Sequence, residues 1–327
     1  MDNLIVSILL SSLVGSFWFL IWRLALTRWE KAEKTVLIYW SLRGISVLYG
    51  VCLLGGIVYG IVSAADGIPL LWEMRSPIVA GLFNVLRIVW LGGAVFRVAD
   101  YVRKHYQHLK VMRNALPPQD KTVHVFQRIS AKMNHSGKGR VGVKFGLTSP
   151  EMCGWFSPKI VLPGEEYTEE ELIHIVSHEL LHFQHKDRWF REAAILLDCI
   201  HWFNPLLRQM VKQMQMWDEF YCDYMVCHLD WVEPACYIET LISLARRQVL
   251  ARGQSDLLVV GFCEDGKYLK QRVQKIMKFR RMKRSDVWQT VAALCVVLIL
   301  GVGTAMTVQI EVNQAYDAYK TEAMLKK

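Results

Sequence analysis

The sequence of residues 168–187 is TEEELIHIVSHELLHFQHKD, and residues 178–182 within it form an H-E-x-x-H motif. Residues four apart on a helix share a face, so His178 and His182 would point the same way and could bind one zinc ion. Glu179 would lie beside them, where it could take a proton from a zinc-bound water. This stretch predicts a metal-dependent hydrolytic site.

Local signals predict that the motif lies on a helix. Thr168 followed by Glu171 is typical of a capping box. Glu169 and Glu170 favour the positive end of the helix dipole. Neither Pro nor Gly occurs in residues 168–187. The motif therefore meets the structural condition that its chemistry requires.

Composition indicates a membrane protein. The chain has 327 residues, of which 53% are hydrophobic, and its mean hydropathy of +0.19 is high for a soluble protein. The apolar residues gather in separate stretches, which predicts membrane spans that alternate with a polar block. The net charge of +9 lies largely in basic residues that flank these stretches. Membrane topology explains this charge better than nucleic-acid binding, so we expect no direct contact with nucleic acid.

Four apolar stretches are long enough to cross a bilayer. They are residues 4–26, 35–62, 77–101 and 287–308. Basic residues follow the first and third stretches and precede the fourth, and basic loops favour the cytoplasmic side. We therefore expect both termini outside the cytoplasm. No basic residue precedes the first stretch, so we expect a retained membrane helix rather than a cleaved signal peptide.

Two basic residues, Arg43 and Arg87, fall within the second and third apolar stretches. A cation at the centre of a membrane costs about 3 kcal/mol on insertion scales. Each side chain should therefore face the helix bundle or a partner rather than lipid. We favour a structural contact over a contact that relays a signal.

The expected fold class is a mainly α membrane protein with an inserted α+β domain. Residues 1–110 would hold three transmembrane helices and their basic flanks. Residues 111–284 would form a cytoplasmic zinc metallopeptidase domain. Residues 285–327 would hold the fourth transmembrane helix and a short extracytoplasmic tail.

Short elements are predicted within the inserted domain. Residues 122–133 are typical of a helix, and residues 141–147 and 154–163 are typical of strands. A peptide substrate can pair with the exposed edge of a strand. We expect such an edge beside the metal helix, supplied either by residues 141–147 or by residues 158–162.

Residues 189–203 are apolar, but they are short for a span and carry charged side chains. We expect a buried helix that leans on the membrane surface through Trp202 and Phe203. The next residues, Asn204 and Pro205, are typical of a helix start.

A catalytic zinc site needs a third protein ligand. The helix after Asn204 carries Glu219 and Asp223, four residues apart and so on one face. Glu219 would be the third ligand, and Asp223 would accept a hydrogen bond from the outer nitrogen of a ligand histidine. On composition alone an ordinary solvated helix face would explain the pair, but its position after a metal motif favours the site. The alternative third ligands are His174, His185, His201 and Asp187.

The eight cysteines form no C-x-x-C pair. Cys222, Cys227 and His228 would make a second metal site only with poor spacing, so we expect buried free thiols. Most of the cysteines lie in the block that we place in the cytoplasm, where thiols stay reduced.

The order of three spans, an H-E-x-x-H domain and a fourth span resembles the BlaR/MecR-type membrane zinc metallopeptidases. The resemblance covers nearly the whole chain. Its motifs here are GWFSPKIVLP (154–163), HELLHFQHKD (178–187), FNPL (203–206) and EFYCD (219–223).

The resemblance implies a gluzincin-like fold and a role for each motif residue. The zinc ligands would be His178, His182 and Glu219. Glu179 would be the catalytic residue, and Asp223 would support the ligands. Family members sense a signal outside the cell, activate the inner protease, cleave themselves and relieve a winged-helix transcriptional repressor.

The sequence departs from the β-lactam sensors of this family. Those sensors carry a penicillin-binding domain after the fourth span, whereas only residues 309–327 follow it here. No S-x-x-K nucleophile motif occurs in the chain. We therefore do not expect β-lactam sensing.

The leading hypothesis is a membrane-integral zinc endopeptidase that transduces a signal by cleaving itself or a cytosolic repressor. Its expected partners are the lipid bilayer and a peptide or protein substrate, and the sequence is compatible with a homodimer. One alternative is a Ste24/HtpX-type membrane protease, although the FNPL and WFSPKIVLP motifs favour the first family. A receptor with a structural zinc is a non-enzymatic alternative. Glu179 argues against it, because a structural zinc has no use for a general base.

Overall fold

The computed structural model describes residues 2–65, 77–135, 139–153, 159–251 and 259–325. Most of these residues are helical, and a small sheet accompanies the helices. The helices are α1 (Asp2–Lys31), α2 (Thr35–Ala65), α3 (Pro77–Arg113), α4 (Asp120–Lys132), α5 (Glu169–Gln184), α6 (Asp187–Ile200), α7 (Pro205–Val226), α8 (Pro234–Ala251), α9 (Val259–Met277) and α10 (Arg284–Leu325). The strands are β1 (Arg140–Lys144), β2 (Glu151–Cys153) and β3 (Lys159–Pro163).

The chain divides into two compact units. The first comprises Met1–Tyr101, Glu192–Met214 and Lys283–Lys327, and the second comprises Val102–Arg191 and Gln215–Met282. The predicted inserted domain, 111–284, therefore contains residues 192–214, which the structure groups with the apolar helices.

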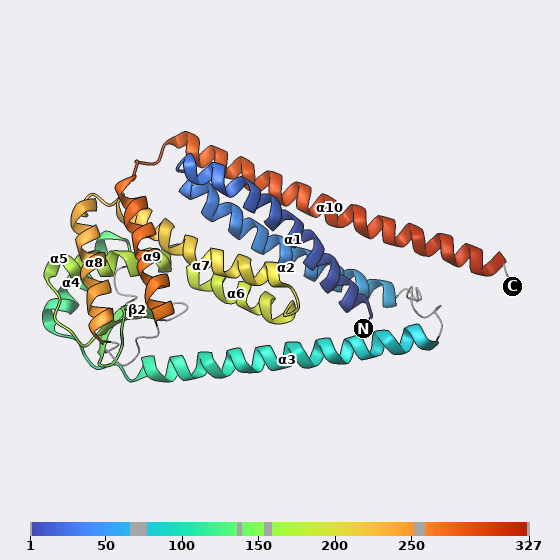
Figure 1. Cartoon of the computed structure of the whole chain (residues 1–327), viewed down its shortest axis with the longest axis horizontal. Helices are drawn as coiled ribbons and strands as arrows, with labels where there is room; N and C mark the ends of the chain where they lie inside the picture. Colours follow the sequence, from blue (N-terminus) through green and yellow to red (C-terminus); the bar gives the residue numbers. More distant parts are fainter. Residues whose placement is uncertain (1, 66–76, 136–138, 154–158, 252–258, 326–327) are drawn as a thin grey trace. The chain divides into compact units, whose positions relative to one another are not determined.

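The first unit is built on α1, α2 and α10, which run side by side (Figure 1). Each of these helices contains a segment that is long and apolar enough to cross a membrane. The segments are Ser7–Lys31, Thr35–Val58 and Ser285–Thr304. They agree with three of the four predicted spans. The remaining prediction, residues 77–101, falls in α3, where only part of the side chains is described, so that span stays a prediction.

Side chains in the first unit follow the rules for helices in lipid. A Cβ on Gly15 of α1 would overlap the ring of Tyr49 on α2, so glycine permits the close approach of these helices. Large apolar side chains on the outer faces are exposed, which suits contact with lipid. Arg43 is only 2% exposed, and its guanidinium lies 4.1 Å from the centre of the Tyr39 ring. This burial agrees with the expectation that Arg43 faces the bundle rather than lipid.

The turn between α6 and α7 packs among the apolar helices of the first unit. Asn204 caps α7 as predicted, because its side-chain oxygen accepts hydrogen bonds from the backbone N–H groups of Leu206 and Leu207. The side-chain amide of Asn204 donates to the hydroxyls of Ser12 and Ser16 on α1.

The neighbouring residues of this turn contact helices of the first unit, and the expected contact of Trp202 and Phe203 with the membrane surface stays a prediction. The indole N–H of Trp202 donates to the backbone carbonyl of Trp90 on α3, at 3.2 Å. His201 is fully buried and forms a 2.8 Å hydrogen bond with Ser11 on α1. Packing against α1 and α3 therefore determines the position of the turn.

The second unit contains a three-stranded sheet with the order β1-β3-β2. β1 pairs parallel to β3, and β2 pairs antiparallel to it. β1 and β3 correspond to the two predicted strands, with residues 154–158 outside the described part. Of the two stretches expected to supply an edge, residues 158–162 do not, because β3 is paired on both sides, whereas residues 141–147 contain most of β1, which lies at one edge of the sheet. The strand β2, which we did not predict, forms one edge.

One hydrophobic cluster holds the second unit together. It joins α4, β3, α5, α7 and α8 through buried side chains that include Val125, Ile160, Leu180, Val226 and Tyr237. Burying a large apolar side chain of this kind contributes about 1.5–3 kcal/mol relative to its exposed state. The packing fixes α5 against α7, and these are the helices that carry the predicted site.

Candidate metal centre

The helix α5 begins and turns as its sequence predicts. The hydroxyl of Thr168 accepts a hydrogen bond from the backbone N–H of Glu171, and the Glu171 carboxylate accepts one from the backbone N–H of Thr168. This is the predicted capping box. About two and three turns after Glu171, His178 and His182 lie on the inner face of the helix, 8% and 7% exposed.

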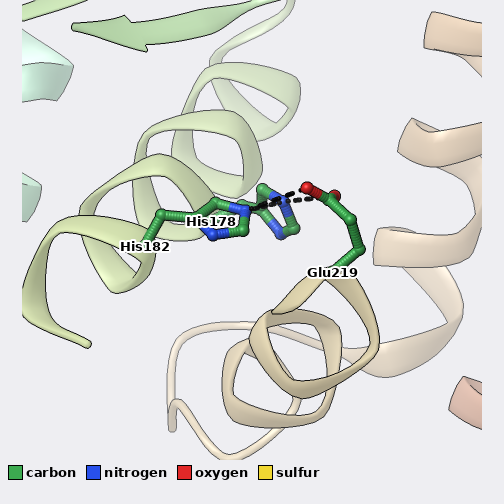
Figure 2. Close-up of side chains that lie close together, drawn as sticks. All are labelled: His178, His182 and Glu219. Carbon is green, nitrogen blue, oxygen red and sulfur yellow. Dashed lines mark hydrogen bonds and ion pairs between the residues drawn. The ribbon is translucent and has the colours of Figure 1, made fainter. Parts of the chain in front are cut away.

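The structure brings these two histidines together with Glu219 of α7. Figure 2 shows the two imidazoles extending from one helix towards a carboxylate on another. The Nε2 atoms of His178 and His182 lie 3.1 Å apart, and each lies 3.4 Å from an oxygen of Glu219. One potential ligand atom from each residue lies within 4.8 Å of the others. Three donors therefore meet at one point.

Hydrogen bonds on the far side of each ring fix the tautomers. Nδ1 of His182 lies 2.5 Å from the Asp187 carboxylate, which can only accept, so Nδ1 carries the proton. The Tyr237 hydroxyl donates to Asp223 at 2.7 Å and lies 2.9 Å from Nδ1 of His178. A hydroxyl has one proton, so His178 must donate to it. Both Nε2 lone pairs are then free to face Glu219.

Asp223 reaches its histidine indirectly. Its carboxylate lies 3.5 Å from Nδ1 of His178, and the Tyr237 hydroxyl joins the two. The direct carboxylate partner of a ligand histidine is instead Asp187, at the start of α6. The expected hydrogen bond from a histidine to Asp223 thus passes through a tyrosine.

This donor set fits a divalent metal ion. Two unprotonated nitrogens 3.1 Å apart repel each other unless a positive charge lies between them and the carboxylate. Burial would lower the pKa of His182, but Cys222, Glu219 and Asp187 together raise it well above its usual value. The anions around His182 therefore favour a positive charge at this point, whether that charge is a proton on Nε2 or a metal ion bound there. Two imidazoles and one carboxylate are a zinc-type ligand set.

Glu179 lines the same pocket as His178 and Glu219, two of the three donors. The pocket has a volume of about 540 Å³ and is bounded by α5, α7, α8, α9 and the residues just before β2. Burial raises the pKa of the Glu179 carboxyl, and the two histidines beside it oppose that effect. A carboxyl group beside a metal-binding point, in a pocket open to a substrate, has the placement of a general base.

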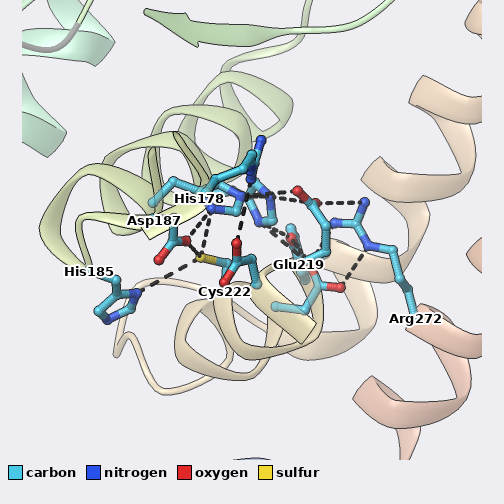
Figure 3. Close-up of polar contacts among 11 residues, drawn as sticks. His178, His185, Asp187, Glu219, Cys222 and Arg272 are labelled. Carbon is cyan, nitrogen blue, oxygen red and sulfur yellow. Dashed lines mark hydrogen bonds and ion pairs between the residues drawn. The ribbon is translucent and has the colours of Figure 1, made fainter. Parts of the chain in front are cut away.

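Arg272 of α9 places a positive charge beside two carboxylates of the site, Asp223 and Glu219. Its guanidinium donates two hydrogen bonds to Asp223, at 2.7 and 2.6 Å, and lies 3.4 Å from Glu219 (Figure 3). Burial would raise the pKa of Glu219, but His182, His178 and Arg272 lower it well below its usual value. The carboxylate is therefore held in the charged form that a metal ligand needs.

The alternative third ligands lie elsewhere. His174 is hydrogen-bonded to Thr240 at 2.7 Å, and His201 contacts Ser11 in the first unit. His185 is 3.9 Å from the sulfur of Cys222 and is in neither group of potential ligands found among the described residues. None of these three joins the pair of histidines.

A second group of potential ligand atoms shares His182 with the first. It consists of His182, Asp187 and Cys222. The hydrogen bond between His182 and Asp187 already accounts for their proximity. Cys222 and Cys227 are buried free cysteines, as expected. His228 bonds instead to the carbonyl of Tyr224 and the N–H of Met282.

Sequence reasoning missed two residues of the site, Tyr237 and Arg272. Tyr237 is one of 12 tyrosines and Arg272 one of 39 basic residues, and neither stands in a motif. Their helices, α8 and α9, reach the site only through tertiary packing. A buried arginine partner for the Glu219–Asp223 face could have been expected on charge grounds, but no spacing identifies which arginine it is.

Comparison with known proteins identifies the family. A family model described as BlaR1 peptidase M56 matches residues 60–276, more than half of the chain. The chain belongs to the M56 peptidase family. Regulatory protein BlaR1 of Bacillus licheniformis is 27% identical over 169 residues, which cover 51% of this chain and 28% of that protein. The methicillin resistance MecR1 proteins of Staphylococcus aureus and Staphylococcus epidermidis are each 24% identical over 250 residues, covering 74% of this chain and 42% of theirs.

Membership of the M56 family indicates a metallopeptidase, and so a metal ion. The BlaR/MecR resemblance seen in the motifs is confirmed. The chain spans less than half the length of these curated relatives. In this M56 chain, apolar helices long enough for a membrane accompany the peptidase region.

Proposed function

We propose that this chain is a membrane-integral zinc endopeptidase that transduces a signal by cleaving itself or a cytosolic transcriptional repressor. The observation that carries the proposal is the convergence of His178, His182 and Glu219 beside a pocket that His178, Glu219 and Glu179 line. The curated relatives are named as regulatory and methicillin resistance proteins, which supports a regulatory role.

The proposal includes the layout predicted from sequence. A cytoplasmic gluzincin-like domain at residues 111–284 would be inserted between the third and fourth of four transmembrane helices, with both termini outside the cytoplasm. Three apolar helical segments support this layout. The partners proposed from the family resemblance are a winged-helix repressor and a second copy of the chain.

The residues of the pocket divide the chemistry between them. His178, His182 and Glu219 would hold the zinc ion, with Asp187 and Asp223 supporting the histidines. When bound, zinc supplies a Lewis acid that polarises the scissile carbonyl and lowers the pKa of a water molecule towards about 7.

Glu179 then takes the proton of the attacking water and gives it to the leaving amine nitrogen. Ser149 and Pro150, just before the edge strand β2, line the pocket together with Glu179. An extended peptide paired with β2 would therefore pass close to this general base.

The test compares the wild-type chain with Glu179→Gln, each purified in full length in a mild detergent. Elemental analysis measures zinc, and gel electrophoresis over time measures self-cleavage fragments. We expect one zinc ion per chain in both proteins. The rate of fragment formation should fall by about 10²–10⁴-fold in the variant, the usual contribution of a general base.

A matched control is Glu170→Gln, which changes an exposed carboxylate on the same helix. It should keep the wild-type zinc content and rate. Wild-type protein without zinc, or a Glu179→Gln variant that cleaves at the wild-type rate, would contradict the proposal. Zinc in both proteins with no fragments from either would favour the receptor with a structural metal.

A further inference from the structure

Arg272 divides its guanidinium between two carboxylates of α7. Its Nε and one terminal nitrogen donate to the two oxygens of Asp223, and its other terminal nitrogen lies 3.4 Å from Oε2 of Glu219. The side chain is 15% exposed. All three nitrogens of the guanidinium therefore face a buried or half-buried anion, an arrangement that the planar fork of arginine permits.

The two oxygens of Glu219 have different surroundings. Oε1 lies 3.4 Å from Nε2 of His182. Oε2 lies 3.4 Å from Nε2 of His178 and also 3.4 Å from Arg272. Figure 3 shows Glu219 between His178 on one side and Arg272 on the other. Oε2 is therefore the oxygen that lies between His178 and the Arg272 guanidinium.

This asymmetry bears on how Glu219 would bind a metal ion. A catalytic zinc site has three protein ligands and keeps a fourth position for water. Two histidine nitrogens and one carboxylate oxygen make three ligand atoms. A carboxylate that binds through both oxygens would also occupy the position that water needs. An oxygen paired with a guanidinium has less charge available for the metal ion.

We propose that Arg272 is a positioning residue that draws Oε2 of Glu219 away from the metal ion, so that Glu219 binds through Oε1 alone and a position stays open for water. The inference rests on the metal site proposed above and adds to it the residue that sets the binding mode of its carboxylate ligand.

Asp223 holds the Arg272 guanidinium in the orientation that directs one nitrogen at Glu219. It is 1% exposed, and besides Arg272 it accepts the hydrogen bond from Tyr237. A buried carboxylate paired with two nitrogens of an arginine fixes both the position and the plane of the fork. The third nitrogen is then directed at Glu219. Lysine presents a single ammonium group and cannot hold both carboxylates in this way.

The test uses cobalt as the probe, in the full-length chain in mild detergent with its zinc replaced by Co²⁺. Four-coordinate cobalt absorbs visible light more strongly than five- or six-coordinate cobalt. We expect Arg272→Gln to bind Co²⁺ with a weaker visible absorption than wild type, because Glu219 then binds through both oxygens. In the zinc form, self-cleavage should slow by about 10–100-fold. Arg272→Lys should restore part of the absorption and part of the rate.

A matched control is Arg247→Gln, which breaks another arginine–carboxylate pair of the same unit. Arg247 of α8 donates to both oxygens of Glu171 at 2.8 and 3.0 Å, away from the metal ligands. This variant should lose stability but keep the wild-type cobalt spectrum and rate. The control separates the loss of a salt bridge from the loss of Glu219 positioning.

Three outcomes would overturn the inference. One is a wild-type spectrum and rate in Arg272→Gln, and another is an equal spectral change in Arg247→Gln. If Arg272→Gln does not fold, the Arg272→Lys variant provides the test. The third contradicting outcome is then a wild-type spectrum and a wild-type rate in Arg272→Lys. A wild-type chain that binds neither Zn²⁺ nor Co²⁺ would instead overturn the proposed metal site itself.

Discussion

Two buried polar clusters of this protein differ in the charge that they contain. The bundle cluster, in the first unit, consists of Ser11, Ser12, Ser16, Tyr49, His201 and Asn204. The metal-site cluster, in the second unit, consists of His178, His182, Asp187, Glu219, Asp223, Tyr237 and Arg272. The first contains only neutral hydroxyl, amide and imidazole groups. The second contains three carboxylates and a guanidinium.

The difference follows from the surroundings of each cluster. Among helices apolar enough for a membrane, an uncompensated charge is costly, so neutral hydrogen bonds fix the packing there. In the metal-site cluster each carboxylate has a histidine or arginine partner, and these partners keep the charge where a metal ion would bind. Damage to the bundle cluster should therefore lower stability, and damage to the metal-site cluster should lower metal affinity.

Asp187→Asn should give the largest effect of the three changes that follow. The Asp187 carboxylate holds the proton of His182 on Nδ1 and leaves Nε2 for the metal ion. An amide can present its N–H₂ group to the ring and favour the other tautomer, which blocks Nε2. We expect zinc affinity to fall by about 10–100-fold. Competition with a chromophoric chelator measures it.

The control for Asp187→Asn is Asp120→Asn. Asp120 also lies in the first turn of a helix, α4, but it is exposed and contacts no ligand. Both changes remove a charge that favours a helix N-terminus, so they share the dipole effect. Equal zinc affinities in the two variants would show that Asp187 acts only through its helix.

Asn204→Ala tests the bundle cluster. The change removes the cap of α7 and the hydrogen bonds that the side-chain amide, with its two hydrogens, donates among the hydroxyls of Ser12, Ser16 and Tyr49. The cap contributes about 0.5–2 kcal/mol, and hydrogen bonds between membrane helices average about 0.6 kcal/mol. We expect a loss of about 1–3 kcal/mol in stability, seen as a lower midpoint of thermal unfolding in detergent, with zinc affinity unchanged.

Asn204→Ser separates the two contributions. Serine caps a helix about as well as asparagine, but its short side chain cannot reach the hydroxyls of α1 and α2. A variant as unstable as Asn204→Ala would assign the effect to the cluster, and one as stable as wild type would assign it to the cap. A fall in zinc affinity in either variant would contradict the separation of the two clusters.

Local patterns predicted the parts of the site that lie on single helices. The spacing of His178 and His182, the capping box at Thr168 and the cap at Asn204 all depend on residues at most four apart. Glu219 was found because a metal motif precedes it in the same block. Each of these features is set by helix geometry, which the sequence displays directly.

The parts that escaped prediction depend on tertiary packing. Arg272 and Tyr237 reach the site from α9 and α8, and Asp187 was named only among the alternative third ligands. The three-residue strand β2 is too short to show an alternating pattern, and the central position of β3 cannot be read from its composition. Residues that meet from distant parts of the chain leave no periodic pattern in the sequence that would reveal their contact.

Arg128→Gln should give the smallest effect and completes the comparison with a charge pair that is not buried. Arg128 of α4 lies 2.6 Å from Glu169 of α5, with side chains 38% and 54% exposed. Solvent and salt screen such a pair, so we expect a loss of about 0.2–1 kcal/mol that shrinks at high salt. Thermal unfolding at two salt concentrations measures it. A loss as large as that of Asn204→Ala would show that charge pairing, rather than burial, governs the stability of α5.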